Sequence, residues 1–205
     1  MLDCLIIGGG VSGVSCALIL GSAHKKAFVN HKKIAIITHQ KASMLQDALF
    51  NNAYGIKPGT LGADLLQTSL NDLKEQYPHI NQIANEKVVS IVNQSDYFLI
   101  TTTENIYESK IVVVAINSSN PFTISGCLDR YVIPHKKSLT SKNRLQLKNN
   151  DHLVFKNMYV AGTLAGHRSQ LAIAAGSGAA VATDILTLWN SGVETHAHDS
   201  IKKNK

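Results

Sequence analysis

Apolar and polar positions along the chain follow two different periods, which together predict a sheet covered by helices. Near-continuous apolar runs of strand length lie at residues 2–7, 33–38 and 110–116, as in parallel strands that are buried on both faces. Small apolar residues from Val11 to about Lys26, and leucines three or four apart from Thr60 to about Tyr77, predict helices instead. Because the first strand, helix and second strand form a right-handed βαβ unit, we expect the two strands to be parallel.

The middle of the chain changes to short strands and loops. Residues 87–93, 96–103 and 106–108 alternate or are β-branched around polar turns, which predicts a small antiparallel β-meander. Residues 118–150 have no clear period and are rich in Ser, Asn, Lys and Pro. We expect an irregular crossover there, with one short strand at 144–147.

The chain returns to regular elements near its end. Residues 155–160 predict a last strand, and Gln170 to about Trp189 predicts a helix whose first half is made almost wholly of small residues. The predicted fold is therefore α/β, with a parallel central sheet and helices on its face. It forms a single domain over residues 1–190, built from 1–117 and 151–190, which the crossover joins.

A glycine-rich turn joins the first strand to the first helix, in the sequence Gly8-Gly9-Gly10-Val11-Ser12-Gly13. Gly8 permits a tight turn, Gly10 leaves room for a pyrophosphate to approach the backbone, and Gly13 lets the helix pack closely on its strand. The free N–H groups of the helix's first turn would face that anion. The pattern therefore predicts a Rossmann-like, dinucleotide-binding fold. The residues expected to hold the pyrophosphate are Gly8, Gly10, Val11, Ser12 and Gly13.

Composition narrows the class of protein. The chain of 205 residues is 44% hydrophobic with a mean hydropathy near zero, which is typical of a soluble globular protein. Its longest apolar runs are too short to span a bilayer, and its N-terminus lacks the features of a signal peptide. We therefore expect a cytoplasmic protein with no membrane partner. Residues 191–205 are polar and predict a flexible tail.

Neither a metal site nor a redox disulfide is predicted. Cys4, Cys16 and Cys127 lie far apart in the sequence, and no Cys-x-x-Cys occurs. The first two lie in the predicted first strand and helix, where small buried hydrophobes are expected, and only Cys127, in a predicted loop, suits a reactive thiol. His196 and His198 lie in the polar tail and are not expected to bind metal.

Positive charges exceed negative ones, giving a net charge of +6 and an isoelectric point of about 9.2. Lysines gather in pairs at 25–26, 32–33 and 136–137 and in the tail, without interleaved arginines or aromatic residues that would stack on bases. Solvated loops and helix ends commonly carry such pairs, so no nucleic-acid partner is expected. The basic surface still suits an acidic protein partner.

Four segments together resemble one known family, the FAD domain of thioredoxin-reductase-like flavoprotein oxidoreductases in the pyridine nucleotide-disulfide oxidoreductase superfamily. The glycine turn resembles the family's FAD fingerprint, and residues 111–118 resemble a strand that usually ends in Ala-Thr-Gly. Residues 157–163, followed by Gln170 and the small-residue helix, resemble the closing segment that usually carries Ala-Gly-Asp and then Arg-Gln. Residues 52–56, within an irregular loop at 39–58, resemble the loop before the second long helix.

The resemblance, which covers residues 2–189, implies that the cofactor is FAD. It also implies that the N-terminus of the last helix lies near the isoalloxazine ring and that the protein is a homodimer. Besides the glycine turn, the positions that it assigns to the cofactor are Thr38, His39, Asn52, Ala115, Asn117, Gly162, Thr163, Gln170 and Leu171.

The chain departs from this family in three ways. Family members insert an NADPH domain where this chain has only residues 118–150, without a second glycine fingerprint, and the family's Cys-x-x-Cys pair is absent. Thr38 replaces a ribose-binding acid, Asn117 a glycine, and Thr163 an acid near the pyrophosphate. Since a charge-assisted hydrogen bond contributes about 1.5 to 3 kcal/mol, we expect FAD to be held more loosely than in the family.

The leading hypothesis is an FAD-binding flavoprotein oxidoreductase that passes electrons between a separate donor and acceptor, each a protein or a small molecule. The alternative is a non-catalytic nucleotide-binding or regulatory module with a degenerate flavin fold, which the missing acids favour. A third is an enzyme that binds NAD or a nucleotide sugar in the same turn. The catalytic residues are unknown. His39 and His167 are candidates only for contacts at the flavin edge or with substrate.

Overall fold

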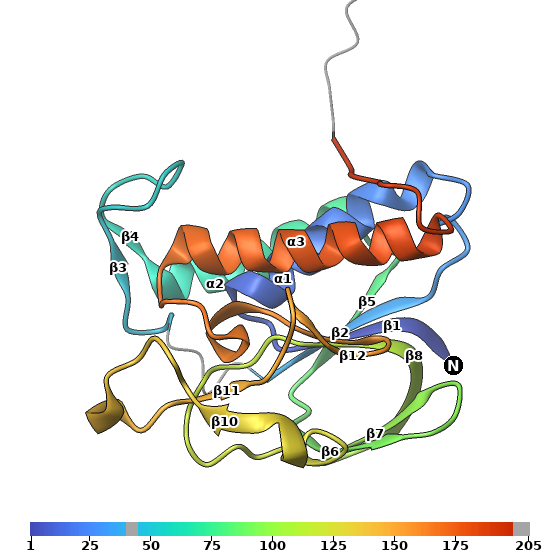
Figure 1. Ribbon diagram of the computed structural model, residues 1–205. Coiled ribbons are helices and arrows are strands. Elements are labelled where there is room, and N and C mark those ends of the chain that lie inside the picture. The colour runs from blue at the N-terminus through green and yellow to red at the C-terminus, as the bar shows by residue number, and fades with distance from the viewer. Residues whose placement is uncertain (40–44, 199–205) are drawn as a thin grey trace, which may run out of the picture.

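Figure 1 shows the structure, a computed structural model that describes residues 1–39 and 45–198. Within these residues a nine-stranded mixed sheet crosses the molecule, and three helices lie together on one face of it. The helices are α1 (Val11–Ser22), α2 (Gly62–Gln76) and α3 (Leu171–Trp189). The predicted α/β class, with helices on the face of a mainly parallel sheet, is confirmed.

The centre of the sheet is parallel and contains the chain's most apolar strands. β1 (Leu2–Ile7) lies between β2 (Ile34–Thr38) and β8 (Ile106–Val114), and both pair with it in parallel. β5 (Ile80–Ala84) continues the sheet beyond β2, and β13 (Met158–Val160) pairs in parallel with the far end of β8. The first βαβ unit therefore has the parallel strands that its sequence predicts.

β8 changes partners along its length. Its first half pairs antiparallel with β7 (Phe98–Thr102), and its second half runs parallel to β1 and β13. The change falls at Ser109, whose buried hydroxyl donates to the carbonyl oxygen of Ile111 at 2.7 Å. The sequence predicts two separate strands, at 106–108 and 110–116. This division is wrong because the chain stays extended between them.

The other strands of the predicted meander are present. β5, which comes before them in the sequence, was not expected. β6 (Val88–Asn93) pairs antiparallel with β7, and its other edge pairs with β9 (Ser125–Gly126). The sequence does not predict β5, because the polar residues Asn81 and Gln82 interrupt its apolar pattern. β5 tolerates them as an edge strand that is only half-buried.

The crossover at 118–150 is more regular than its sequence suggests. Besides β9, it contains β10 (Val132–Pro134) and β11 (Leu145–Leu147), which pair antiparallel, so the short strand predicted at 144–147 is confirmed. Two turns of 3-10 helix, Asp129–Tyr131 and Thr140–Lys142, complete it.

Three element boundaries also differ from expectation. The single strand predicted at 155–160 is a hairpin of β12 (Leu153–Phe155) and β13, because Asn157 adopts a left-handed conformation with φ of 65°. The helix expected from Thr60 begins at Gly62 instead, since β4 (Thr60–Leu61) pairs with β3 (Leu49–Phe50). α1 ends at Ser22 and continues as a 3-10 turn, Ala23–Lys25.

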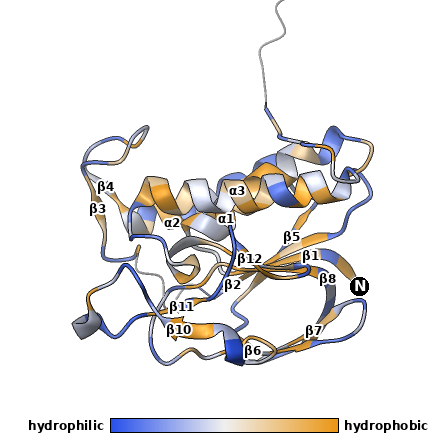
Figure 2. Cartoon of the chain, viewed as in Figure 1, coloured by the Kyte–Doolittle hydropathy of each residue, from blue (hydrophilic) through white to orange (hydrophobic). Residues whose placement is uncertain are grey.

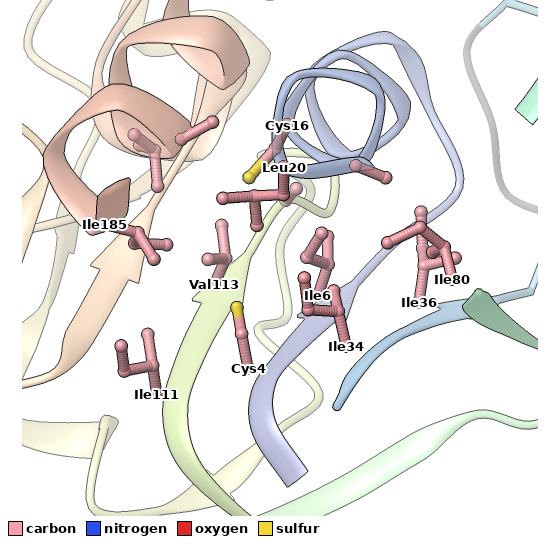
Figure 3. Packing of buried hydrophobic residues seen from close by; sticks show 14 of the residues in the cluster. Cys4, Ile6, Cys16, Leu20, Ile34, Ile36, Ile80, Ile111, Val113 and Ile185 are labelled. Carbon is pink, nitrogen blue, oxygen red and sulfur yellow. The ribbon is translucent and has the colours of Figure 1, made fainter. Parts of the chain in front are cut away.

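Two hydrophobic clusters lie on the two faces of the sheet, and Figure 2 shows the apolar strands between them. Alternate residues of β1 supply both, since Cys4 and Ile6 pack under the helices while Leu5 and Ile7 face the other side. Figure 3 shows Cys4 and Cys16 among the isoleucines of the helix side. Burial raises the pKa of both thiols, so each acts as a small buried hydrophobe.

Within the described residues, α3 is the one helix long and apolar enough to span a membrane by those two measures. This finding differs from the sequence-based expectation that every apolar run is too short. However, α3 packs along α1, and Val181, Ala182, Ile185 and Leu186 are buried in the cluster under it. In this structure one face of α3 is therefore packed into the core, while Ile173 and Leu188 are exposed.

Candidate cofactor site

A cavity of about 450 Å³ opens at the carboxyl ends of β1, β2 and β8, where ligands bind in open parallel sheets. The glycine turn and the first turn of α1 form one wall, and the N-terminal turn of α3 forms another. Eleven of the fourteen cofactor residues predicted from the sequence line it: Gly8, Gly10, Val11, Ser12, His39, Asn52, Ala115, Asn117, Thr163, Gln170 and Leu171.

The glycines of the turn have two distinct roles. Gly8 has a φ of 117°, and a Cβ there would lie 2.5 Å from the carbonyl oxygen of Ala115, while a Cβ on Gly13 would overlap the carbonyl oxygen of Gly8. These two glycines let β1, β8 and α1 approach one another. A Cβ on Gly10 would meet nothing within 4 Å. Gly10 therefore leaves open space at the cavity wall rather than room for another part of the chain.

The first turn of α1 is suited to an anion. Gly10 is its N-cap, and no side chain caps the helix there. The N–H groups at this end carry the positive end of the helix dipole toward the cavity, which Val11 and Ser12 line. Open space at Gly10 and an uncapped helix N-terminus together fit the pyrophosphate of a dinucleotide.

Three predicted residues lie outside the cavity lining. Gly13 is buried in the first turn of α1 against the backbone of Gly8, and Gly162 is buried with its missing side chain facing the Ser12 hydroxyl. Thr38 is 5% exposed, and its hydroxyl donates to the backbone oxygen of Ile83 in β5 at 3.4 Å. The Thr38 hydroxyl is thus already used within the sheet, and His39 is the residue at the end of β2 that lines the cavity.

Several lining residues were missed from the sequence. Leu45, Ala48, Leu49 and Phe50 form an apolar wall before and within β3, in the segment expected to be irregular. Their signal was weak because a two-residue strand has no detectable period, and residues 40–44 of the same predicted loop lie outside the described residues. Polar lining residues were missed as well: Glu86 and Lys87 follow the unpredicted β5, and Arg144 and Ser169 precede β11 and α3.

Glu86 is a fully engaged carboxylate at the cavity wall. It accepts hydrogen bonds from the Thr102 hydroxyl at 2.5 Å, the Asn105 amide at 2.8 Å and the Tyr107 hydroxyl at 2.8 Å. Burial alone would raise the pKa of Glu86, but these hydrogen bonds outweigh it and hold the pKa below its usual value. Glu86 is therefore ionised at neutral pH and supports β7 and β8 rather than acting as a general acid.

Arg144 brings a positive charge to the cavity from the crossover. Its guanidinium Nη1 donates to the hydroxyl of the buried Ser118 at 3.2 Å, and the next backbone N–H, of Leu145, donates to the Ser118 carbonyl oxygen at 2.9 Å. Arg144 is thus fixed by the segment that directly follows β8. A cation at this wall favours an anionic ligand.

A histidine cluster lies behind the Gly162–Thr163 corner. The N–H of Gly162 donates to the Ser177 hydroxyl oxygen at 2.8 Å, and that oxygen lies 3.0 Å from Nε2 of His152. The same Nε2 lies 3.0 Å from Nε2 of His167. Burial lowers the pKa of both histidines, and the proximity of His152 lowers that of His167 further. The cluster holds the corner in place from the core side.

Asp151, His152 and Ser177 have the residue types of a catalytic triad but not its geometry. The Asp151 carboxylate is 94% exposed and lies 3.6 Å from Nδ1 of His152, beyond hydrogen-bond distance. Ser177 is 5% exposed, already accepts the Gly162 N–H and is not part of the cavity lining. This arrangement supports the backbone of the corner and offers no nucleophile.

Comparison with known proteins identifies the family. The family model described as pyridine nucleotide-disulphide oxidoreductase matches residues 2–179, which is most of the chain. The chain belongs to this family. No curated protein matches the sequence. The resemblance predicted from the glycine turn and the closing segment is confirmed, and so is its extent over nearly the whole chain.

Solved structures of thioredoxin reductases share this family's fold. A ferredoxin-flavin thioredoxin reductase from Clostridium acetobutylicum is 16% identical, with a TM-score of 0.67 over 93% of this chain and 98% of that one. A thioredoxin reductase from Gloeobacter violaceus is 13% identical, with a TM-score of 0.68 over 98% of each chain. The atypical thioredoxin reductase TRi from Desulfovibrio vulgaris Hildenborough is 12% identical, with a TM-score of 0.68 over 95% and 100%. At these identities the likeness shows a common fold.

Proposed function

We propose that this member of the family binds FAD in the cavity and acts as a flavoprotein oxidoreductase that passes electrons between a separate donor and a separate acceptor. The observation that carries the proposal is the open space at Gly10 beside the uncapped N-terminus of α1. This feature serves no packing role and suits a pyrophosphate. When bound, FAD would supply the electron-transfer chemistry itself.

The residues of the chain would bind the FAD, orient it in the cavity and polarise it. The backbone N–H groups of α1 would hold the pyrophosphate, with Arg144 adding positive charge at the same cavity. The N-terminus of α3, where Gln170 is the N-cap residue and no side chain caps the helix, would present its dipole to the other half of the cofactor. Leu49 and Phe50 would exclude water from one side.

The test is to purify the protein and record its visible spectrum, then titrate the cofactor-free protein with FAD and with NAD. A yellow protein, or one that binds added FAD more tightly than NAD, supports the proposal. A colourless protein that binds no added FAD would refute it. Preferential binding of NAD would favour the NAD-binding alternative instead.

The second candidate is a non-catalytic nucleotide-binding or regulatory module. It is favoured by Thr38, whose hydroxyl is directed to β5, and by the neutral Thr163 at the cavity wall. The two candidates separate on turnover: FAD that binds but transfers electrons from a reduced donor protein to an acceptor no faster than free FAD does supports the module. A homodimer and a cytoplasmic location stay predictions, which gel filtration and cell fractionation test.

A further inference from the structure

Positive charge is concentrated in one part of the sequence. Residues 130–183 contain eight lysines and arginines and a single acid, Asp151. The rest of the chain contains twelve lysines and arginines and thirteen acids. Six of the eight cations lie between Arg130 and Lys148, where no acid occurs. The net charge of the whole protein thus comes from the crossover and the closing segment.

The fold gathers part of this charge at one place. Pairing of β10 with β11 brings His135 against Arg144, whose carbonyl oxygen accepts the His135 N–H at 2.9 Å. Arg168 donates from Nη1 to the carbonyl oxygen of Lys137 at 3.4 Å, which joins the closing segment to the same hairpin. We call Lys136, Lys137, Lys142 and Arg168 the basic rim; all four side chains are exposed.

The basic rim has no acidic partners within the described part of the chain. Among the described residues, the lysines that lie within 4.0 Å of a carboxylate are Lys32 and Lys110. Both pair with Asp3, which lies outside the basic rim. Unpaired exposed cations repel one another, so a cluster of them is unfavourable unless a partner neutralises it. The rim therefore has the electrostatic character of a docking surface.

The rim borders the proposed cofactor cavity. Nε2 of His135, next to Lys136, lies 3.1 Å from the carbonyl oxygen of Thr163, which lines the cavity. On the other side Arg168 is followed directly by Ser169 and Gln170, which also line it. A molecule bound to the rim would consequently lie beside the cavity mouth.

We propose that the basic rim docks an acidic electron-carrier protein, an inference that rests on the proposed function. Leu139 is 68% exposed between Lys137 and Lys142, and an exposed apolar side chain among charges suits a protein interface. Residues 135–144 contain no Phe, Tyr or Trp that would stack on bases. Each one-electron carrier oxidised at the rim would give up one electron. Two such encounters, with two protons from water, would convert FAD to FADH₂.

Charge reversal tests the surface. The probe is a plant-type [2Fe–2S] ferredoxin, an acidic one-electron carrier, and its affinity is measured for FAD-loaded protein at low salt and at about 0.5 M salt. For the triple variant Lys136→Glu/Lys137→Glu/Lys142→Glu we expect an affinity at low salt at least about tenfold weaker than wild type. High salt should bring the two to within about twofold of each other, because it screens exposed charges.

The matched control is Lys25→Glu/Lys33→Glu/Lys74→Glu, which changes the net charge equally at three exposed lysines outside residues 130–183. We expect it to keep the wild-type affinity for ferredoxin within about threefold. Equal losses in the two triples, no salt-dependent binding by wild type, or tighter binding to single-stranded DNA or phosphatidylserine vesicles would overturn the inference.

An FAD titration of every variant separates the two proposals. If wild type binds no FAD, the proposed function fails and the docking inference falls with it. If all variants bind FAD equally but the rim variant still binds ferredoxin as wild type does, only the docking inference fails.

Discussion

The carbonyl oxygen of Ser12 in α1 occupies the space that a side chain on Gly178 in α3 would need. The two helices are also joined by the Ser15 hydroxyl, which donates to the carbonyl oxygen of Ala175 at 2.8 Å. Because both helices begin at the cavity, this close approach sets the distance between their N-termini. The small residues of α3 thus serve helix packing at Gly178.

Replacing Gly178 with alanine should destabilise the protein. The new Cβ would overlap backbone atoms, which cannot rotate away, so α3 must shift from α1 at a cost of about 1–3 kcal/mol in the free energy of unfolding. Urea denaturation measures this change. The matched control is Gly176→Ala in the same helix, where a Cβ would meet nothing within 4 Å.

For Gly176→Ala we expect no loss, or a gain of up to about 1 kcal/mol, because alanine favours a helix more than glycine does. Stability that is unchanged in Gly178→Ala, or lowered equally by both substitutions, would contradict the packing described for α1 and α3.

Gly10→Val should separate binding from folding. Gly10 has φ of −81° and ψ of −176°, which any residue adopts, and a side chain would enter open space. The melting temperature should therefore stay within a few degrees of wild type. FAD affinity should fall by about a hundredfold or more, since the side chain would occupy the position proposed for the pyrophosphate. An unchanged dissociation constant in a fluorescence titration would show that the pyrophosphate lies elsewhere.

Thr163→Asp should tighten FAD binding. A carboxylate accepts a hydrogen bond from a cofactor hydroxyl more strongly than a threonine does, by about 1 kcal/mol, so the dissociation constant should fall about fivefold. The control is Thr163→Asn, because asparagine has nearly the same shape as aspartate without its charge. It should change the dissociation constant for FAD less than Thr163→Asp does. Equal or weaker affinity in Thr163→Asp would mean that Thr163 does not occupy the position of the family's acid.

The sequence predicted the parts of the site whose local pattern is complete in itself. The turn from Gly8 to Gly13 needs only a strand before it and a helix after it, so its geometry was readable. Glu86 was missed because it follows β5, whose parallel pairing with β2 is a tertiary contact that its polar residues hide. Arg144 was missed for a related reason: its side chain reaches the cavity only because β11 pairs with β10.

The histidine cluster should make the free energy of unfolding depend on pH. The pKa values of His152 and His167 in the folded protein are lowered, chiefly by burial, below the usual 6.5. As the pH falls below about 7, the unfolded chain therefore binds more protons than the folded one. The free energy of unfolding is consequently highest above about pH 7 and declines toward pH 5.

His152→Asn should reduce this decline, because the variant has one fewer group to protonate on unfolding and alters the environment of His167. Urea denaturation at pH 5, 6, 7 and 8 measures the free energy of unfolding. His31→Gln, a substitution of an exposed histidine, is the control and should keep the wild-type decline. The carboxylates with lowered pKa values, Asp3 and Glu86, lose their contribution only in more acidic solution, which keeps the two effects apart. A decline between pH 7 and 5 as steep in His152→Asn as in wild type would show that protonation of this cluster does not oppose folding.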